Sequence, residues 1–419
     1  MIDPRFLRDN PDLIRRSLAR RGADIDLDAI ISLEEEARAA QTEAEQARAA
    51  QREAGKDIAR LEGPAKESAI ASVQELADRV KTLTARADEL RSEFDQVWLT
   101  VPNLVDDTAA EGLHEGEGEV LREVGERPEF DFEPLDYAAI GEDLDIIDTV
   151  RAAKVSGSRF GYLKGQAVLL EFALVRWALD HMVAAGHTPM VPPVLVREEA
   201  LVGTGFFPAD REQVYAVEAD DLYLVGTSEV PLAAYHADEI FETGDLPARY
   251  AGFSTCFRRE AGTYGKDTTG IFRVHQFDKV EMFVFCLPGD SPNEHDRLLE
   301  LEESLVRQLE VPYRVVNIPA GDLGASAAKK YDIEAWFPSQ GRYREITSCS
   351  NTTDYQARRL QVRYRAESGN ETIHTLNGTA CAIGRTILTL LENHQQEDGS
   401  VLVPEALRPY TGFDRLGAA

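Results

Sequence analysis

The sequence has few of the features that place a protein in a membrane or outside the cell. No apolar run approaches the ~20 residues that a transmembrane helix requires. The first residues, MIDPRFLRDNPD, contain no apolar signal-peptide core. With 43% hydrophobic and 28% charged residues among 419, the composition is that of a globular protein of two or three domains. We therefore expect a cytoplasmic protein without a membrane partner.

Cysteine is scarce. The chain has four, Cys256, Cys286, Cys349 and Cys381, with no C-x-x-C pair among them. Their wide spacing argues against a disulfide framework and against a thiolate zinc site. We expect reduced, buried thiols and no zinc.

Positive charge is also scarce, because 74 acidic residues face 45 Lys and Arg, for a net charge of -29. The excess is concentrated in one segment. Residues 106–148 hold 16 Asp and Glu against Arg122 and Arg127. Such an acidic, Gly- and Pro-containing stretch is typical of a linker or edge element. It separates two predicted domains, 1–110 and 111–419.

A long helical hairpin is predicted before this acidic stretch. Small and apolar residues recur at alternating steps of three and four, which is the pattern of a coiled-coil seam. The breaker Gly63-Pro64 divides the pattern into two matching halves, so the two helices must fold back antiparallel to bury their stripes. About 30 residues per helix give an arm about 45 Å long. The seam residues are Ile30, Leu33, Ala37, Ala40, Ala44, Ala47, Ala54, Ile58 and Leu61, then Val73, Leu76, Val80, Leu83, Ala87, Leu90, Phe94 and Val97.

Four cations, Arg48, Arg52, Lys56 and Arg60, follow one another at steps of four on the outer face of the first helix. Residues at this spacing form one ribbon, which suits a nucleic-acid phosphate backbone. A solvated face with Glu and Asp pairs is the alternative interpretation.

The C-terminal two thirds changes to mixed helix and strand. An amphipathic helix is expected at Leu169–Val183, and a shorter helix at Pro231–Ile240. Strand-like runs joined by hairpin-type loops favour an antiparallel sheet over a doubly wound one. There is no G-x-x-x-x-G-K-[ST] and no G-x-G-x-x-G after a strand, so a nucleotide is not expected to be held by these motifs. The predicted strands are Leu222–Gly226, Tyr250–Arg259, Ile271–Phe285 and Tyr343–Ser350.

Charged residues sit on two of these strands, around the loop Ala261–Gly270. Because strand side chains alternate, Arg258 and Glu260 share one face and Arg259 points the other way. On the second strand Phe277, Lys279, Glu281 and Phe283 share a face, which gives room for a ligand with a phosphate over Arg258. Cross-strand ion pairs around a core Phe277 are the alternative.

Three further stretches carry polar groups at element ends. Thr227-Ser228-Glu229 ends a strand, either as an ammonium site or as a helix cap. The strand Glu345-Ile346-Thr347-Ser348-Cys349-Ser350-Asn351 offers the hard oxygen ligands that Mg²⁺ accepts. Asn377-Gly378-Thr379 leads into a helix whose first turns carry Arg385, a phosphate clamp.

Together these residues resemble the bacterial seryl-tRNA synthetase family from end to end. The three class II aminoacyl-tRNA synthetase signatures are similar to the segment ending in Met190-Val191-Pro192-Pro193, to Phe257-Arg258-Arg259-Glu260 through Phe283, and to Asn377-Gly378-Thr379 through Arg385. Seryl-type features are the arm, Thr227-Ser228-Glu229, residues 275–281 and Gln396-Glu397-Asp398-Gly399-Ser400. The resemblance implies an α+β fold, with an antiparallel coiled-coil arm followed by a class II catalytic domain whose antiparallel sheet is flanked by helices, in a homodimer.

The implied activity is serine–tRNA ligation, in which L-serine and ATP give seryl-adenylate and the serine is then transferred to tRNA(Ser). A selenocysteine tRNA, tRNA(Sec), is a second candidate acceptor. Residues 1–110 would bind tRNA through Arg48, Arg52, Lys56 and Arg60. The implied catalytic residues are Arg258, Arg385 and Glu345. Mg²⁺ would lie on Glu345 and Ser348. The implied ATP-binding residues are Arg258, Arg259, Glu260, Val274, Phe277, Glu345, Ile346, Thr347, Ser348 and Arg385, and the serine-binding residues are Thr227, Ser228, Glu229, Arg258, Glu281 and Thr379.

The alternatives are a non-catalytic relative, an enzyme that loads amino acids onto a carrier protein, and another class II specificity. All of Arg258, Glu281, Glu345 and Arg385 are present, which argues against the first. The long arm argues against the second, and the hydroxyl-binding pair Glu281 and Thr379 against the third. His394 departs from the family pattern, in which a tyrosine is more usual, and we expect it to serve packing or a hydrogen bond.

Overall fold

The computed structural model describes residues 1–58, 61–261 and 271–417. The chain divides into two compact units, Asp3–Leu18 with Ala23–Pro102, and Met1–Ile2 with Ala19–Gly22 and Asn103–Ala419. We describe each unit by itself. No described helix is long and apolar enough to cross a lipid bilayer.

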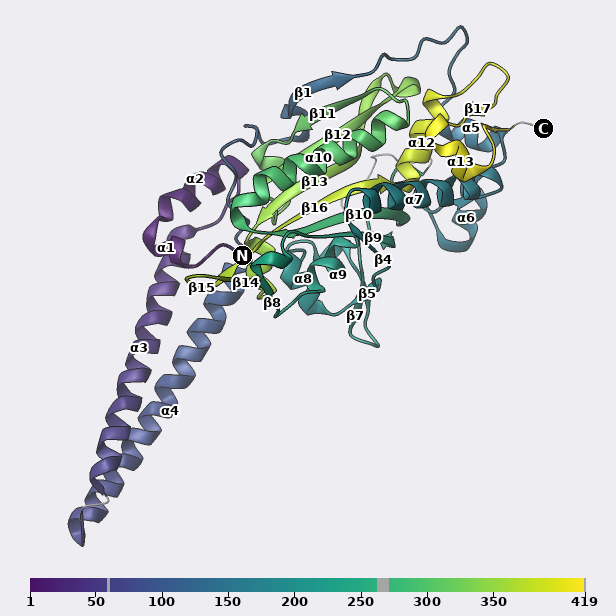
Figure 1. The fold of residues 1–419 in the computed structure, drawn as a ribbon. Coiled ribbons are helices and arrows are strands. Elements are labelled where there is room, and N and C mark those ends of the chain that lie inside the picture. Colours follow the sequence, from purple (N-terminus) through teal and green to yellow (C-terminus); the bar gives the residue numbers. More distant parts are fainter. Residues whose placement is uncertain (59–60, 262–270, 418–419) are drawn as a thin grey trace. The chain divides into compact units, whose positions relative to one another are not determined.

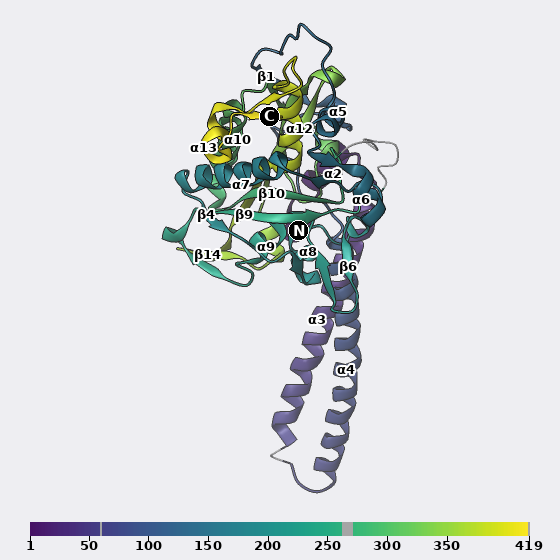
Figure 2. The same ribbon diagram turned by 90° about the vertical axis from the view of Figure 1, so that its right-hand side faces the viewer.

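The first unit contains the predicted helical hairpin, formed by α3 (Leu27–Ile58) and α4 (Pro64–Trp98) (Figure 2). Short helices α1 (Arg5–Asp9) and α2 (Pro11–Arg21) precede it. Pro64 begins α4, where its missing N–H costs no hydrogen bond. Ala37, Ala44, Ala87, Leu90 and Phe94 of the predicted seam are buried, which confirms the antiparallel pairing.

The second unit is built on an eight-stranded sheet in the order β1-β11-β12-β13-β16-β10-β9-β4 (Figure 1). Every neighbouring pair is antiparallel except β4 and β9, which run parallel. The predicted antiparallel sheet is therefore confirmed. The strands are β1 (Glu119–Val124), β4 (Thr188–Met190), β9 (Ala248–Phe257), β10 (Gln276–Cys286), β11 (Tyr313–Asn317), β12 (Lys329–Phe337), β13 (Arg342–Thr353) and β16 (His374–Ala382).

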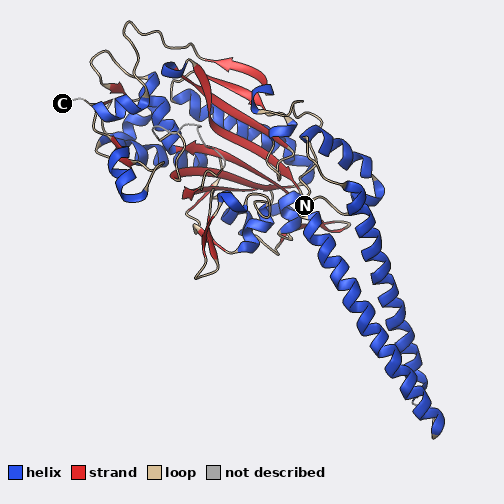
Figure 3. Ribbon diagram, turned by 180° about the vertical axis from the view of Figure 1, so that it is seen from behind, coloured by secondary structure: helices blue, strands red, loops and turns tan. Residues whose placement is uncertain are grey.

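Helices α7 (Gln166–Ala184), α10 (Ser291–Gln308) and α12 (Ile383–Asn393) cover one face of this sheet, and Figure 3 shows strands and helices in separate colours. Apolar side chains of these helices and the even-numbered residues Val280, Met282 and Val284 of β10 form the main core. In α7 the buried positions Leu170, Leu174 and Trp177 recur at helical spacing, as predicted. Gly186, at φ 87°, then supplies the left-handed conformation that ends such a helix.

The opposite face is partly covered by a smaller core around Phe283 and Phe285 of β10. Short helices on this side are α8 (Glu198–Thr204), α9 (Glu229–Ala234) and α11 (Tyr355–Arg359). The rest of this face, over β13, β16 and the first half of β10, is left for a pocket.

Smaller elements complete the unit. They are helices α5 (Tyr137–Asp143), α6 (Thr149–Ser156) and α13 (Arg408–Thr411), the sheet of β5 (Leu195–Val196), β7 (Leu222–Leu224) and β6 (Tyr215–Val217), the sheet of β15 (Gly369–Thr372), β14 (Arg363–Ala366) and β8 (Ile240–Glu242), and the pairs β2 (Ile147–Asp148) with β3 (Tyr162–Leu163) and β17 (Val401–Leu402) with β18 (Arg415–Leu416).

Two predicted elements begin or end five or more residues from the expected position. The strand expected from Ile271 begins only at Gln276, because residues 271–275 form an irregular return that rejoins the sheet where the Arg258 N–H donates to the His275 carbonyl. The helix expected over Pro231–Ile240 stops at Ala234. Asp238, at φ 63°, turns the chain, and Ile240 starts β8.

The acidic stretch 106–148 is a structured part of its unit. Its β1 is the edge strand of the large sheet and pairs with β11. Arg122 of β1 donates to the buried carboxylate of Glu303 on α10. The stretch is therefore an edge element, with only part of its length in loops.

Candidate active site

A pocket of about 390 Å³ opens on the face of the sheet opposite α10. This volume lies within the range of about 300–1,000 Å³ that small-molecule sites usually occupy. Its walls come from β10, β13 and β16, from the segments flanking the β9–β10 connection, and from the first turn of α12. Three residues of β10 that were predicted to share one face of the strand, Phe277, Lys279 and Glu281, all line the pocket. This prediction is therefore confirmed.

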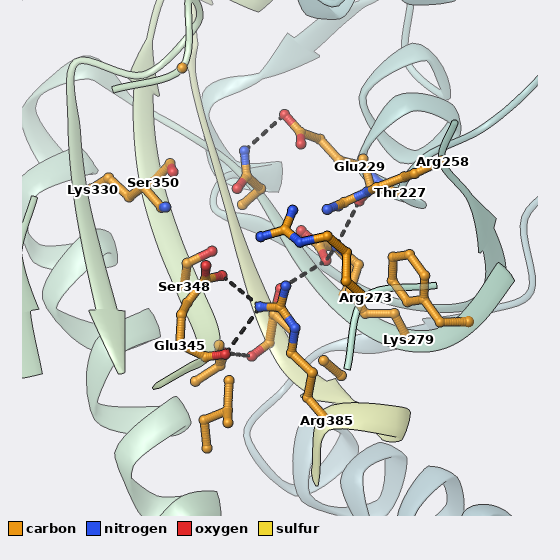
Figure 4. Close-up of a pocket in the computed structure, with 18 of the residues that line it drawn as sticks. Thr227, Glu229, Arg258, Arg273, Lys279, Lys330, Glu345, Ser348, Ser350 and Arg385 are labelled. Atoms are coloured by element: carbon orange, nitrogen blue, oxygen red, sulfur yellow. Dashed lines mark hydrogen bonds and ion pairs between the residues drawn. The ribbon is translucent and has the colours of Figure 1, made fainter. Parts of the chain in front are cut away.

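Arg258 follows β9 and reaches into the pocket. Its Nε donates to the Gly226 carbonyl at 3.1 Å, and its guanidinium carbon lies 5.1 Å from the centroid of the Phe277 ring. The ring and the carbonyl fix the guanidinium while its terminal N–H groups face the cavity (Figure 4). Such a fork is suited to a bidentate oxyanion.

Glu260 lines the pocket with Arg258, and Arg259 points away from it, as alternation predicted. The Arg259 guanidinium lies 5.8 Å from the centroid of the Tyr215 ring. The structure therefore does not bring Arg259 among the lining residues. Arg273 donates to the Glu260 carboxylate at 3.0 Å, so a second guanidinium joins this wall.

Glu345 and Arg385 lie next to each other in the pocket (Figure 4). Arg385, on the first turn of α12, lies 3.2 Å from the Glu345 carboxylate and donates to its backbone carbonyl at 3.1 Å. Burial opposes ionisation of Glu345, but the charges of Arg385, Lys330, Arg258 and Arg273 outweigh it and lower its pKa to about 2. Glu345 is therefore a carboxylate at neutral pH.

A β-bulge lets Glu345 and Ser348 line the same pocket. Residues three apart on a regular strand point to opposite faces. Here Thr347 pairs with Ile333 and Glu345 pairs with Glu334, so Ile346 is the extra residue of β13. The bulge turns the Glu345 side chain toward the face that holds Ser348.

The oxygen atoms of Glu345 and Ser348 are suitable ligands for Mg²⁺. An ionised carboxylate and a hydroxyl are hard oxygen ligands, and Mg²⁺ commonly takes one or two such protein groups, with waters and phosphate oxygens as the rest. Among the residues that the structure describes, no group of three or more His, Cys, Asp or Glu side chains could hold a metal alone. Glu345 and Ser348 would therefore hold the ion together with a bound phosphate.

The other end of the pocket is lined by a compact polar cluster. The buried Lys279 ammonium donates to the Thr227 hydroxyl at 2.8 Å and pairs with the Glu281 carboxylate. The Thr379 hydroxyl donates to Glu281 at 3.4 Å. Burial raises the pKa of Glu281, against the opposing charge of Lys279. These groups can bracket a small hydroxyl and an ammonium.

Glu229 lies beside this cluster, with its carboxylate accepting from Asn377 at 2.9 Å and from Gln356 at 2.7 Å. Burial, and then the negative charge of Glu281, raise the pKa of Glu229 to about 7. Ser228 does not line the pocket, since its hydroxyl donates to the Gly252 carbonyl beneath α9.

Val274, Ile346 and Thr347 line the pocket as predicted. The Thr347 hydroxyl donates to the Thr379 carbonyl and so links β13 to β16. Sequence reasoning gave no role to Arg273, Lys330 or Asn377, which also line it. Lys330 lies next to Lys329 in a strand that also carries Asp332 and Glu334, so nothing in the sequence marked it as a pocket residue.

On α3, Arg48, Arg52 and Lys56 are exposed, and Arg60 lies outside the described residues. Lys56 lies 2.7 Å from Glu53, and Arg48 donates to the Thr84 hydroxyl at 3.3 Å. Most of the predicted loop Ala261–Gly270 likewise lies outside the described residues.

Two smaller expectations are confirmed. All four cysteines are free and buried. The His394 side chain makes the expected hydrogen bond, in which its Nε2–H donates to the Leu309 carbonyl oxygen at 2.8 Å.

Comparisons with known proteins identify the family of the chain. Residues 1–105 match the family described as Seryl-tRNA synthetase N-terminal domain, and residues 214–394 match the tRNA synthetase class II core domain (G, H, P, S and T). A serine–tRNA ligase of Acidothermus cellulolyticus is 54% identical over 417 residues, 99% of each chain.

Two solved structures are also similar. The crystal structure of seryl-tRNA synthetase from Pyrococcus horikoshii complexed with ATP has a TM-score of 0.94 and 41% identity, over 99% of both chains. The cytoplasmic serine–tRNA ligase from Naegleria fowleri in complex with AMP has a TM-score of 0.89 and 36% identity, over 99% of this chain and 98% of that one. The chain therefore belongs to the seryl-tRNA synthetase family.

Proposed function

We propose that this protein activates L-serine with ATP, giving seryl-adenylate and pyrophosphate, and then transfers the serine to tRNA(Ser). One observation carries the proposal. A single pocket joins a cationic half, with Arg258, Arg273 and Arg385, to a polar half around Glu281 and Thr379 (Figure 4). The Pyrococcus horikoshii protein, 41% identical, is described as complexed with ATP.

The chemical obstacle is charge repulsion. The serine carboxylate must attack the α-phosphorus of ATP, and like charges about 4 Å apart repel by about 4 kcal/mol at an effective dielectric near 20. Arg258 is placed to bind the carboxylate and the α-phosphate together, while Arg385 binds the γ-phosphate. No side chain must act as nucleophile or base, since the substrate carboxylate is already ionised. Catalysis rests on positioning and charge neutralisation.

Around the nucleotide, Phe277 and Val274 border the base, and Glu260 contacts its amino group. Arg259 lies outside the lining, where its backbone N–H donates to the Gln213 carbonyl and its guanidinium faces Tyr215. Ile346 and Thr347 shape the wall between Glu345 and Ser348. Glu345 and Ser348 would hold Mg²⁺, which when bound supplies positive charge to the phosphate oxygens.

Serine selection follows from the polar half of the pocket. Thr227 and Glu229 receive the α-ammonium, while Glu281 and Thr379 bracket the side-chain hydroxyl. Ser228 supports this site from beneath by anchoring the start of α9. A site built to bind a hydroxyl rejects an analogue without it by roughly 10⁴ to 10⁵. Alanine is therefore expected to be a poor substrate.

For the second step, we assign residues 1–110 to tRNA binding and residues 111–419 to catalysis. Within the first range, the hairpin cations Arg48, Arg52, Lys56 and Arg60 would contact the tRNA. A tRNA(Sec), if it is also a substrate, would be bound by the same surface. We also infer a cytoplasmic location, where tRNA and ATP are both present.

We also propose a homodimer built through the first signature. On α7 and after β4 large apolar side chains are exposed, with Leu169 54%, Phe172 62% and Val191 81% accessible. Apolar patches of this kind often mark an interface, and a second copy of the same helix and strand would cover them.

Pyrophosphate exchange into ATP, tested with each of the twenty amino acids, examines the proposal directly. Exchange that depends on serine, with alanine and threonine far weaker, is the expected result. Exchange with another amino acid alone would assign a different class II specificity, and no exchange with any would favour a non-catalytic relative. Serine transfer to a carrier protein and not to tRNA would favour the carrier-loading alternative.

A further inference from the structure

Gln356 lies directly behind Glu229, outside the pocket lining. It belongs to α11 and is fully buried. Its Nε2 donates to Glu229 Oε1 at 2.7 Å and to the Thr204 carbonyl at 3.1 Å. Thr204 ends α8, and the next residues, Gly205 and Phe206, line the pocket. One amide group therefore joins the substrate-facing carboxylate to the segment that forms the adjoining wall.

The orientation of this amide is fixed by its partners. A carboxylate and a backbone carbonyl can only accept, so the NH₂ group must face them. On the other side, the Oε1 of Gln356 accepts from the Thr375 hydroxyl at 3.0 Å. Both ends of the amide are thus held by groups that are themselves buried.

Both amide donors to Glu229, from Gln356 and from Asn377, reach the same oxygen, Oε1. The carboxylate is therefore held from one side, and its second oxygen is directed to the pocket that it lines. Because the donors are neutral, they orient the carboxylate without cancelling its charge. A carboxylate that must bind an ammonium needs both properties.

We propose that Gln356 is a positioning residue for amino-acid binding, which keeps the Glu229 carboxylate correctly oriented for the α-ammonium of the substrate. The inference rests on the proposed function and adds to it a residue that touches neither substrate. Three charged groups face Glu229 from the elements around it, Glu281 and Lys279 on β10 and Arg258 after β9. Glu281 disfavours the ionised form of Glu229, and the Gln356 amide opposes that effect.

The test is a Gln356→Met variant, which keeps the length of the side chain and removes the donor. In serine-dependent pyrophosphate exchange we expect the KM for serine to rise about tenfold to a hundredfold, the range for a hydrogen bond to a charged group. The KM for ATP should stay within about twofold, because Gln356 contacts nothing in the cationic half of the pocket. Gln361→Met is the matched control, since Gln361 is exposed and donates to the Arg358 carbonyl.

A pH profile separates positioning from a general loss of structure. Loss of a donor to the carboxylate raises the pKa of Glu229, so the rise of kcat/KM for serine with pH should move to higher pH in Gln356→Met. Gln356→Glu provides a second variant of the same shape. It places an acceptor against Glu229 and should weaken serine binding more strongly, while ATP binding measured by fluorescence or calorimetry is retained.

An unchanged serine KM in both variants would overturn the inference. So would equal rises of the serine and ATP KM values with an unshifted pH profile, because these indicate a merely structural role. If the wild-type protein shows no serine-dependent exchange, the proposed function itself is refuted. If only the variants behave like the wild type, the inference about Gln356 fails and the proposed function stands.

Discussion

The guanidinium of Arg385 lies 3.2 Å from the carboxylate of Glu345, and it also donates to the Glu345 backbone carbonyl. The pair joins the first turn of α12 to β13 at the point of the bulge. In the proposed reaction, these residues bind phosphate and Mg²⁺. Their contact keeps both side chains aimed into the pocket before any ligand arrives, which lowers the cost of ordering them on binding.

Glu345→Gln should raise the Mg²⁺ concentration required for half-maximal exchange by at least about tenfold. The amide keeps a hydrogen bond to Arg385 but loses the ionised oxygen that the cation prefers. Mg²⁺ titration of the exchange rate measures the effect. Glu334→Gln is the matched control, because Glu334 pairs with Glu345 across the sheet but its carboxylate is held by Arg314 outside the pocket. An equal shift in both variants would contradict the assignment.

Arg258→Ala should reduce serine-dependent exchange by about 10³-fold or more, with thermal unfolding little changed. The reason is that the carboxylate and α-phosphate lose the cation placed between them. Arg259→Ala removes the same charge from the neighbouring residue, which faces Tyr215. It should lose less than about tenfold. Comparable losses of exchange activity in the two variants would contradict the assignment, because only the Arg258 side chain points into the pocket.

Neutralising the hairpin cations, in Arg48→Gln, Arg52→Gln and Lys56→Gln together, should weaken tRNA charging and leave exchange intact. If all three contact phosphates, the dependence of log Kd for tRNA on log salt should become shallower by about 2. Filter binding at several salt concentrations tests this. A simultaneous loss of exchange would indicate that the variant damages the catalytic unit.

Stability should fall in acid partly because of His187. Burial, together with the charges of Arg249 and Arg297, lowers the pKa of this histidine to about 4 from an ordinary value near 6.5. The unfolded chain therefore binds the extra proton between these limits. The stabilisation is complete above pH 6.5 and is lost as the pH falls toward 4, by about 2 to 3 kcal/mol.

His187→Leu should flatten this part of the stability profile. Urea unfolding at pH 7, 6, 5 and 4 gives the free energies to compare with the wild type. His295, whose pKa burial also lowers to about 4, remains and retains part of the slope. A profile for His187→Leu that parallels the wild type throughout would exclude a contribution from His187.

Periodicity accounts for what the sequence predicted well. The seam of α3 and α4 and the apolar stripe of α7 repeat over many residues, so local spacing alone indicates their faces. The alternation along β10 likewise placed Phe277, Lys279 and Glu281 on one face. The roles of individual residues came from the family resemblance, because spacing alone favoured ion pairs and helix caps.

Irregular backbone accounts for most of what was missed. The bulge at Ile346 reverses the alternation of β13, and nothing in the composition of that strand marks it. Arg273 lies in a return that looked like the start of a strand, so its ion pair with Glu260 could not be inferred. Gln356 is an ordinary polar residue of a short helix, and its contact with Glu229 joins positions 127 apart in the chain.

The acidic segment 106–148 provides the strand at one edge of the large sheet, and its charges affect what can pair with that edge. An edge strand presents unpaired N–H and C=O groups to any extended chain that approaches, and β1 occupies this position with Glu119, Arg122 and Glu123. The surrounding negative charges repel the same strand of another copy and make it costly for a foreign strand to dock. The segment that carries 16 minus 2, or 14, of the 29 excess negative charges thus also protects the edge of the sheet from edge-to-edge aggregation.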